Sequence, residues 1–550
     1  MQQKQIIKIL EEMGDLLELS EDNPYKARAY YRGAEALREN PDCNLEDSHS
    51  LLELPGIGES LARLILELKT KGTSEHLIEL REQVPNEFRR LLHFPGLGAK
   101  TIRAILKEIK PRNLGELERA IKDREIRKIK GLSSKTEAKL KRGLELMRNP
   151  QAEFPLGQVL PLGREMEEFL LKVPGVTAAG LVGSTLRGRE TVRDLDIVVG
   201  TADSAKVLAA LSTHAKLEKV LQKEDDHLSF VTWMGLPGDI YLVPPEAYIV
   251  AHQQLQGAVE HHRYLIELGK EKGFQWEFVP PNVYSQLGLP EFPPELREGD
   301  SLVEISPELI RLPDIKGDLH MHTRWSDGGN SILEMALAAA DKGYEYIAIC
   351  DHSQNLAIAK GLKGEQLRQQ RLEIDKVNLQ LDGKFKVLAG TEADILKNGE
   401  LDYANELLEE LDLVVASVHQ RFKLDIDQMT ERIVNALKNP HVDILAHPTG
   451  RLVGSRDPYD IHLEKIFAAA AKNKKALEIN SSPSRLDLKD KYASMARDYG
   501  IPLVIDTDAH SIDELNDMEY GVITARRANL DKTQVLNTKT LPELEEWLTR

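Results

Sequence analysis

The sequence has few cysteines and no long apolar run. Its 550 residues include only two cysteines. Two cysteines cannot form a disulfide framework, so we expect a reducing, cytoplasmic setting. No stretch of about 18 consecutive apolar residues occurs, so we expect no transmembrane helix and no membrane partner. The first residues are too polar for a secretory signal. A chain of this length is expected to fold into about three to four domains.

The chain also lacks a positive net charge. Its formal net charge is −17, which, taken over the whole chain, argues against a nucleic-acid partner. The charge is unevenly distributed, however, because residues 101–150 hold 15 Lys and Arg against 7 Asp and Glu, an excess of 8. Such a stretch is either a solvated helical face or a surface that faces phosphate groups.

The first 150 residues are predicted to be helical and contain a repeated glycine motif. The motif Pro-Gly-aliphatic-Gly occurs at residues 55–58 and at residues 95–98, and residues 129–133 form a weaker copy. Each copy follows one helical segment and precedes another. Apolar residues recur about every 3.6 positions in three segments, which are 6–19, 24–39 and 59–70.

This glycine motif suits a contact with a nucleic-acid backbone. Glycine allows a positive φ and a close approach to a ligand, and the free N–H groups at the next helix start can hold a phosphate oxygen. Two copies followed by a basic stretch favour sequence-independent DNA binding over a plain helix connector. The motifs resemble helix-hairpin-helix motifs. The residues expected to contact DNA are Gly56, Gly58, Gly96, Gly98 and Lys100.

Residues 151–290 show a mixed α/β pattern and three candidate metal-binding carboxylates. Asp194 and Asp196 lie on one predicted strand, and Asp239 lies on a second. Three carboxylates that hold two Mg or Mn ions form an arrangement suited to in-line nucleotidyl transfer. We therefore predict that these residues are catalytic, although exposed strand acids are the simpler alternative for any one pair.

The residues before these carboxylates are candidates for nucleotide binding. Gly183 and Ser184 could hold a triphosphate through the backbone N–H and the hydroxyl, and Arg187 could neutralise it. Together with the helical region, this segment resembles the family X DNA polymerases of the nucleotidyltransferase superfamily. The resemblance covers roughly residues 1–300 and implies a palm and thumb, with deoxynucleoside triphosphates as substrates.

The segment departs from the family pattern around the nucleotide pocket. The family has two adjacent arginines after Gly-Ser-X, where this chain has Leu186 first. Arg193 replaces a glycine before the first aspartate, and Tyr241 replaces a basic residue after the third. Of the Tyr-Phe-Thr-Gly-Ser stretch only Gly257 remains. The position of the lyase lysine found in some members is Leu64, so lyase activity is not carried over.

Residues 316–550 alternate between predicted strands and helices, which indicates a parallel barrel. In such barrels functional residues lie at the C-terminal ends of strands. Six of the eight histidines in this half follow or end predicted strands, while His441 and His462 do not and are taken as ordinary. A lone histidine is more often structural, but six at one pole together with three carboxylates favour metal binding. These candidates are His320, His322, Asp327, His352, Glu392, His419, His447, Asp508 and His510.

Nine ligands are more than one or two metal ions require. Three ions with shared ligands fit better, and Glu392 is the expected bridge because a carboxylate has two oxygens to share. The predicted chemistry is phosphoester hydrolysis. The motifs, from Asp-Leu-His-X-His-Thr-X-X-Ser-Asp-Gly to Thr-Asp-Ala-His, resemble those of the PHP (polymerase and histidinol phosphatase) domain. This resemblance implies a distorted seven-stranded barrel with three Mn, Zn or Fe ions. Arg451 is a candidate phosphate contact by its position.

The expected fold is multidomain α/β, in five segments. These are a helical N-terminal domain with the first hairpin at 1–82, a fingers-like DNA-binding region at 83–150, a palm and thumb at 151–290, a linker at 291–315 and a phosphoesterase barrel at 316–550.

The combination resembles bacterial family X polymerases, which are DNA repair enzymes. It implies gap-filling DNA synthesis by the palm and Mn-dependent 3′-5′ exonuclease and 3′-end trimming by the barrel, in a protein expected to be monomeric. Two alternatives stay open. One is a DNA-binding nuclease or phosphatase whose palm no longer polymerises, and the other is a non-catalytic DNA-binding scaffold.

Overall fold

The computed structural model falls into two compact units, each formed by several stretches of the chain. The first unit contains residues 1–154, 162–182 and 193–252, and the second contains 155–161, 183–192 and 253–550. The structure describes residues 3–20, 24–40, 43–45, 47–84, 88, 91, 97, 99–134, 136–138, 140–141, 144, 153–214, 216–224, 226–276, 278–299 and 304–549.

None of the helices in these described ranges combines the length and the apolar character that crossing a bilayer requires.

The N-terminal part of the first unit is helical, as its apolar spacing predicts. The long helix α1 packs along α2 and also contacts α4, α5 and α6. Its buried face includes Leu10, Met13 and Leu17, which lie three or four positions apart and so share one side of the helix. The helices are α1 (Gln3–Ser20), α2 (Pro24–Glu39), α3 (Ser48–Leu52), α4 (Glu59–Lys71), α5 (Glu75–Gln83), α6 (Ala99–Ile109) and α7 (Leu114–Lys122).

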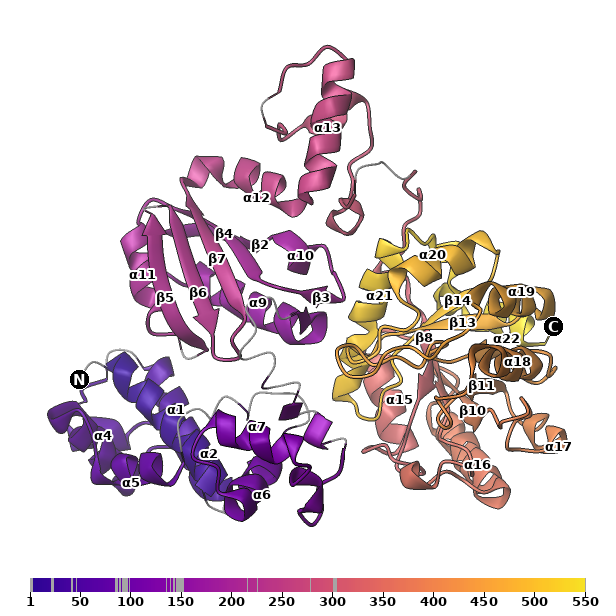
Figure 1. Cartoon of the computed structure of the whole chain (residues 1–550), viewed down its shortest axis with the longest axis horizontal. Coiled ribbons are helices and arrows are strands. Elements are labelled where there is room, and N and C mark those ends of the chain that lie inside the picture. The colour runs from indigo at the N-terminus through magenta and orange to yellow at the C-terminus, as the bar shows by residue number, and fades with distance from the viewer. Residues whose placement is uncertain are drawn as a thin grey trace. The chain divides into compact units, whose positions relative to one another are not determined.

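A five-stranded mixed sheet forms the rest of the first unit (Figure 1). The strand order is β2-β4-β7-β6-β5, and the pair β4 and β7 is parallel while the other pairs are antiparallel. The strands are β2 (Val176–Leu181), β4 (Leu195–Thr201), β5 (Leu217–Glu224), β6 (His227–Thr232) and β7 (Pro237–Val243). Helix α11 (Ser204–Leu211) belongs to this unit, and helix α9 (Leu156–Leu171) begins in the second unit and continues into the first. The short strands β1 (Phe154–Pro155) and β3 (Thr191–Val192) form a separate two-stranded sheet, and β3 and helix α10 (Gly183–Leu186) belong to the second unit.

Seven parallel strands make the barrel of the second unit, in the sequential order β8 to β14. The last strand returns to the first through a parallel bridge between Met321 and Ala509, and the N–H of His322 donates to the carbonyl of Ala509 at 2.8 Å. The predicted distorted seven-stranded barrel is therefore confirmed. The strands are β8 (Gly317–Met321), β9 (Tyr346–Ile349), β10 (Lys386–Asp394), β11 (Leu413–Ser417), β12 (Ile444–Leu445), β13 (Ala476–Asn480) and β14 (Leu503–Asp506).

Helices lie around these strands (Figure 1). Every residue of β8, β9, β11, β12, β13 and β14 is buried, as expected for parallel strands covered on both sides. The helices of this part are α15 (Ile332–Asp341), α16 (Gly364–Gln380), α17 (Asn405–Leu408), α18 (Ile426–Leu437), α19 (Leu463–Asn473), α20 (Asp490–Asp498), α21 (Met518–Arg527) and α22 (Leu541–Leu548).

Residues between the sheet and the barrel form helices α12 (Tyr248–Gln256), α13 (Val259–Glu271) and α14 (Val283–Leu287). Their apolar cluster includes Leu265, Tyr284 and Phe292. The last part of the predicted linker belongs to the barrel core, because Ile310 and Ile315 are buried in the main barrel cluster. The backbone of Ile310 also pairs with that of Leu530 at 3.1 Å.

Candidate metal centre and carboxylate site

The strand ends of the barrel bring together the nine residues that the sequence singles out. His320 is the fourth residue of β8, and Glu392 is in β10, where its backbone forms a parallel bridge with His352. The remaining residues lie in the turns that directly follow strands. Because parallel strands all end at the same pole, residues far apart in sequence converge there.

The side-chain nitrogen and oxygen atoms of eight of these residues fall into three overlapping groups, and the ninth residue, His447, contacts Glu392 of the third group. Within each group one atom from every residue lies within 4.8 Å of the others. His322 and His352 each belong to two groups, so the three groups form one continuous cluster. The groups are His322, Asp327, His352 and His510; His320, His322 and Asp508; and His352, Glu392 and His419.

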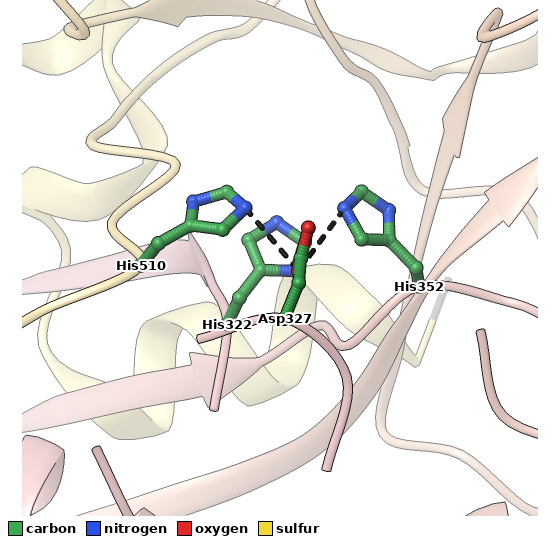
Figure 2. Close-up of side chains that lie close together, drawn as sticks. All are labelled: His322, Asp327, His352 and His510. Carbon is green, nitrogen blue, oxygen red and sulfur yellow. Dashed lines mark ion pairs between the residues drawn. The ribbon is translucent and has the colours of Figure 1, made fainter. Parts of the chain in front are cut away.

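Asp327 is the meeting point of the first group. Figure 2 shows His510 and His352 reaching toward its carboxylate from opposite sides, with His322 behind it. The Oδ1 atom of Asp327 lies 3.4 Å from Nε2 of His510 and 3.6 Å from Nε2 of His352. Asp327 lies in the loop after β8, and the loop is fixed because the N–H of Gly328 donates to the carbonyl of Thr323 at 2.9 Å.

Glu392 is the meeting point of the other histidines. Its Oε1 lies 2.9 Å from Nε2 of His447 and 3.2 Å from Nε2 of His419, while its Oε2 lies 2.7 Å from Nδ1 of His352. The same Oε2 is 3.6 Å from Nε2 of His320. Glu392 therefore lies at the centre of the histidines with both oxygens engaged, and its bridging role stays a prediction.

Burial and mutual charge shift the pKa values in this cluster strongly. Burial alone raises the pKa of Asp327, but its hydrogen bond to His510 and the nearby histidine charges outweigh this and lower the pKa to about 2. For His419, burial lowers the pKa, and the carboxylate of Glu392 reverses the shift and raises it to about 9. Burial and the charges of His510 and His352 lower the pKa of His322 to about 3. Such divergent values are typical of functional clusters.

Several buried nitrogens in the cluster have no hydrogen-bond partner among the residues that the structure describes. These are Nε2 of His320 and Nδ1 of both His322 and His447. A buried polar atom without a partner costs roughly 1–3 kcal/mol. A metal ion bound to Nε2 of His320 would remove part of that cost, so the donor set fits transition-metal binding.

The sequence analysis did not identify the carboxylates that contact the second ring nitrogen of two of these histidines. Glu478 in β13 is fully buried, and its Oε1 lies 2.7 Å from Nδ1 of His320. Asp394 in β10 accepts a hydrogen bond from the backbone N–H of His419 at 3.2 Å, and its Oδ1 lies 3.4 Å from Nδ1 of that ring. Carboxylates in this position fix the orientation of a ligating histidine. A pattern in the sequence that could have identified Glu478 is an acidic or amide residue inside an otherwise apolar strand, as in Leu477-Glu-Ile-Asn480.

The three predicted palm carboxylates meet in the mixed sheet. Asp196 in β4 and Asp239 in β7 are direct partners in the parallel register, and Asp194 immediately precedes β4. All three act on one side chain, because burial and then the charges of Asp196, Asp239 and Asp194 raise the pKa of Tyr241 to about 12. The three acids are therefore close enough to one ring for all of their charges to act on it.

Asp239 already has close protein partners. Its Oδ1 lies 2.9 Å from Nε2 of His227 and accepts a hydrogen bond from the hydroxyl of Ser229 at 2.5 Å. His227 in turn stacks on Tyr241, with ring centroids 5.2 Å apart. Both partners lie on β6, the strand next to β7, and the sequence analysis did not identify either of them.

The two arginines predicted to contact phosphate are both held by glutamates. Arg187 follows α10, which begins with Gly183 and Ser184, and its Nε lies 3.0 Å from Oε1 of Glu298. Arg451 follows β12, and its Nη2 lies 2.7 Å from Oε2 of Glu190. Both arginine side chains are largely buried.

The first glycine hairpin has the open geometry that phosphate binding requires. Gly56 has a φ of +94° in the turn between α3 and α4. Gly58 is the N-cap of α4, without a side-chain cap, and no heavy atom lies within 4 Å of the position where its Cβ would be. Lys100 is exposed in α6, whereas Gly96 and Gly98 lie outside the described residues.

Comparison with known proteins supplies three family matches. A helix-hairpin-helix domain matches residues 1–74, a SAM-like helix-hairpin-helix tandem matches residues 88–145, and the PHP domain matches residues 318–482.

One relative matches along its whole length. The DNA polymerase/3′-5′ exonuclease PolX of Bacillus subtilis (strain 168) is 38% identical over 570 aligned positions, which cover 100% of both chains. A protein described as "Probable phosphatase" from Thermoanaerobacter sp. (strain X514) is 31% identical over 243 positions, covering 42% of this chain and 93% of the relative. A similarly described protein of Acetivibrio thermocellus is 29% identical over 242 positions, covering 42% of this chain and 95% of the relative.

Proposed function

Because the chain belongs to the family of the bacterial DNA polymerase/3′-5′ exonuclease PolX, we propose that it is a DNA repair enzyme with two active sites. The mixed sheet extends a primer across short gaps, and the barrel hydrolyses phosphodiester bonds at DNA 3′ ends. The observation that carries the hydrolytic half is the convergence of nine His, Asp and Glu side chains at one pole of the barrel. DNA and deoxynucleoside triphosphates are the proposed ligands of a monomeric protein.

In the barrel, the three groups of converging side chains would hold three Mn, Zn or Fe ions. Such ions supply a water of lowered pKa and neutralise charge on a phosphate oxygen. The chain itself orients the donors. Glu478 at 2.7 Å from Nδ1 of His320 turns Nε2 of that ring toward Glu392 and Asp508. Because His320 and Glu392 are almost fully buried, their geometry is fixed before substrate arrives.

In the mixed sheet, Asp194, Asp196 and Asp239 would hold two Mg or Mn ions. Two ions would assist attack by the primer 3′-hydroxyl on the triphosphate. Gly183, Ser184 and Arg187 are the proposed triphosphate contacts, and a phosphate bound by Arg187 would replace its ion pair with Glu298. We assign the segments as helical and DNA-binding at 1–82 and 83–150, palm and thumb at 151–290, linker at 291–315 and phosphoesterase at 316–550.

A second candidate is a DNA-binding nuclease or phosphatase whose palm no longer polymerises. The contacts of His227 and Ser229 with Asp239 favour it, because they engage an oxygen that a metal ion would use. The relative from Thermoanaerobacter described as a probable phosphatase matches 42% of this chain over 93% of its own length, which also fits a hydrolytic activity that does not need the whole chain.

The test combines metal analysis of the purified protein with two DNA assays. We expect extension of a gapped primer in Mg²⁺ or Mn²⁺ that is lost in Asp194→Ala, and removal of 3′-terminal nucleotides in Mn²⁺ that is lost in His320→Ala. Each variant should keep the other activity. A wild-type protein that trims ends but does not extend a primer would establish the second candidate. A protein without bound transition metal and without either activity would overturn both.

A further inference from the structure

A cavity of about 450 Å³ lies beside the ends of strands β10 and β11. Its volume is within the range of small-molecule sites, which is about 300–1,000 Å³. No carboxylate occurs among the described residues that line it, although the whole chain carries a net charge of −17. The polar lining consists of three cations and three amides, namely Lys397, Arg421, Arg432, Asn355, Asn398 and Gln420.

The cavity is built on a fixed floor. Arg432 of α18 is buried, and its Nε donates to the carbonyls of Ile395 and Leu396 at 3.0 Å each. Its Nη1 donates to the carbonyl of Gln420 at 2.8 Å. One guanidinium therefore ties the loop after β10 to the loop after β11, and both loops contribute to the lining.

The cavity wall is directly connected to the candidate metal centre. The carboxylate of Asp394 accepts a hydrogen bond from the amide side chain of Asn355 and lies 3.4 Å from Nδ1 of His419. Gln420 follows His419 in the chain, and its side-chain amide donates to the carbonyl of Asn355 at 3.0 Å. A ligand in this cavity would thus lie next to the group formed by His352, Glu392 and His419.

We propose that this cavity binds one nucleotide of the DNA strand whose 3′ end the barrel hydrolyses. Lys397 and Arg421, both exposed, hold a phosphate of that nucleotide. The amides of Asn398 and Gln420 face its base with the hydrogen-bonding capacity that remains beside their contacts with Glu400 and with the carbonyl of Asn355. An amide offers both a donor and an acceptor, so it can pair with an edge of any base. The site would accept all four nucleotides. This inference rests on the proposed hydrolytic function and names its substrate subsite.

A single phosphate would not account for the cavity. Phosphate alone needs cations or N–H groups, whereas here three amides extend the lining beyond the two exposed cations. A nucleotide has both an anionic and a base portion, and it matches this division of charge and hydrogen-bonding groups. Cations at the site also attract the anionic strand from solution.

The test uses the full-length Lys397→Glu and Arg421→Glu variants, with Lys376→Glu as a control. Lys376 is an exposed lysine of α16 that does not line the cavity. Two substrates are compared, a 3′-labelled oligonucleotide and the small diester bis(p-nitrophenyl) phosphate. We expect KM for the oligonucleotide to rise at least tenfold in each cavity variant, so that the rate ratio of oligonucleotide to small diester falls by a similar factor. The control variant should keep the wild-type ratio.

Inhibition separates a nucleotide site from a phosphate site. Deoxyadenosine 5′-monophosphate should inhibit hydrolysis of the small diester by wild type, and its inhibition constant should rise about tenfold in the cavity variants. Deoxyribose 5-phosphate should inhibit much more weakly. Equal inhibition by the two compounds, an unchanged KM in the variants, or equal losses on both substrates would overturn the proposal.

A failure of the proposed function gives a different result. In that case wild type hydrolyses neither substrate, and calorimetric titration with deoxyadenosine 5′-monophosphate decides on the cavity. The nucleotide site is supported if wild type and the control variant bind the nucleotide and the cavity variants bind it at least tenfold more weakly. Equal affinities, or no binding by wild type, overturn it.

Discussion

The barrel and the mixed sheet both bring acidic side chains together, but these side chains contact different kinds of neighbours in the two regions. In the barrel, nine residues from six strand ends gather with Asp327 and Glu392 at the centre, and several buried ring nitrogens have no hydrogen-bond partner among the described residues. In the sheet, three acids come from two adjacent strands, and Asp239 is engaged by His227 and Ser229. In the barrel the contacts of the central carboxylates are with other members of the predicted ligand set, whereas in the sheet Asp239 is engaged by two residues outside the predicted set.

The largest expected effect is the removal of the central charge in the barrel. In Glu392→Gln, five histidines lose the carboxylate they share, so we expect metal content to fall and 3′-end hydrolysis to drop at least about 1,000-fold, or roughly 4 kcal/mol. Primer extension by the sheet should be unaffected. The control Glu365→Gln changes an exposed glutamate of α16 and should retain wild-type hydrolysis. A variant of Glu392 with full metal content and full activity would contradict the bridging role.

A smaller effect is expected from the carboxylate behind His320. In Glu478→Gln, the hydrogen bond to Nδ1 can form but the charge is lost, so we expect metal affinity to fall about 10–100-fold. Metal titration of the metal-free protein measures this directly, and added metal should restore hydrolysis. Glu464→Gln, at an exposed position of α19, is the matched control. A loss of activity without any change in metal affinity would contradict a role of Glu478 in orienting His320 for metal binding.

The stability of helix α13, which follows the mixed sheet in the chain, is expected to depend on pH through the buried His261. Burial, then the charges of His262 and Arg297, lower the pKa of His261 to about 4 from the usual 6.5. The fold therefore favours neutral His261. Its contribution to stability is fully present above pH 6.5 and is lost as the pH falls toward 4.

Between pH 7 and pH 5 the loss should be about 2 kcal/mol, which lowers hydrogen-exchange protection factors in α13 about 30-fold. His261→Gln should remove most of this dependence, whereas His76→Gln, at an exposed site, should keep it. An equally steep dependence in His261→Gln would assign it to other groups.

The smallest predicted effect concerns the contacts that distinguish the sheet from the barrel. In His227→Ala, Asp239 loses a hydrogen bond worth about 1 kcal/mol, so the Mg²⁺ concentration for half-maximal primer extension should fall about fivefold. Ser229→Ala should shift it in the same direction. If His227→Ala instead raises that concentration, His227 positions Asp239 for the metal rather than competing with it.

Most of the barrel could be predicted from the sequence because two of its features are local: the apolar patterns of its strands and helices, and the polar residues that directly follow the strands. Strands and helices alternate with clear apolar patterns, and the largely apolar run at residues 476–479, for example, coincides with β13 except for the last residue of the strand. A polar residue directly after such a strand is visible without the fold. The second palm strand was identified in the same way, but its register with β4, which pairs Asp196 with Asp239, is not a property of either segment alone.

The sequence by itself determined the parallel barrel, the nine residues at its strand ends and the three palm acids, because strand ends of a parallel barrel meet at one pole whatever their distance in the chain. Only the tertiary structure decided which carboxylate lies behind which histidine, and that Arg187 and Arg451 are paired with Glu298 and Glu190. The partners of these pairs lie far apart in the sequence, and the most distant pair, Arg451 and Glu190, is separated by 261 positions. Their contacts depend on side-chain rotamers and loop paths, which local patterns of hydrophobicity do not encode.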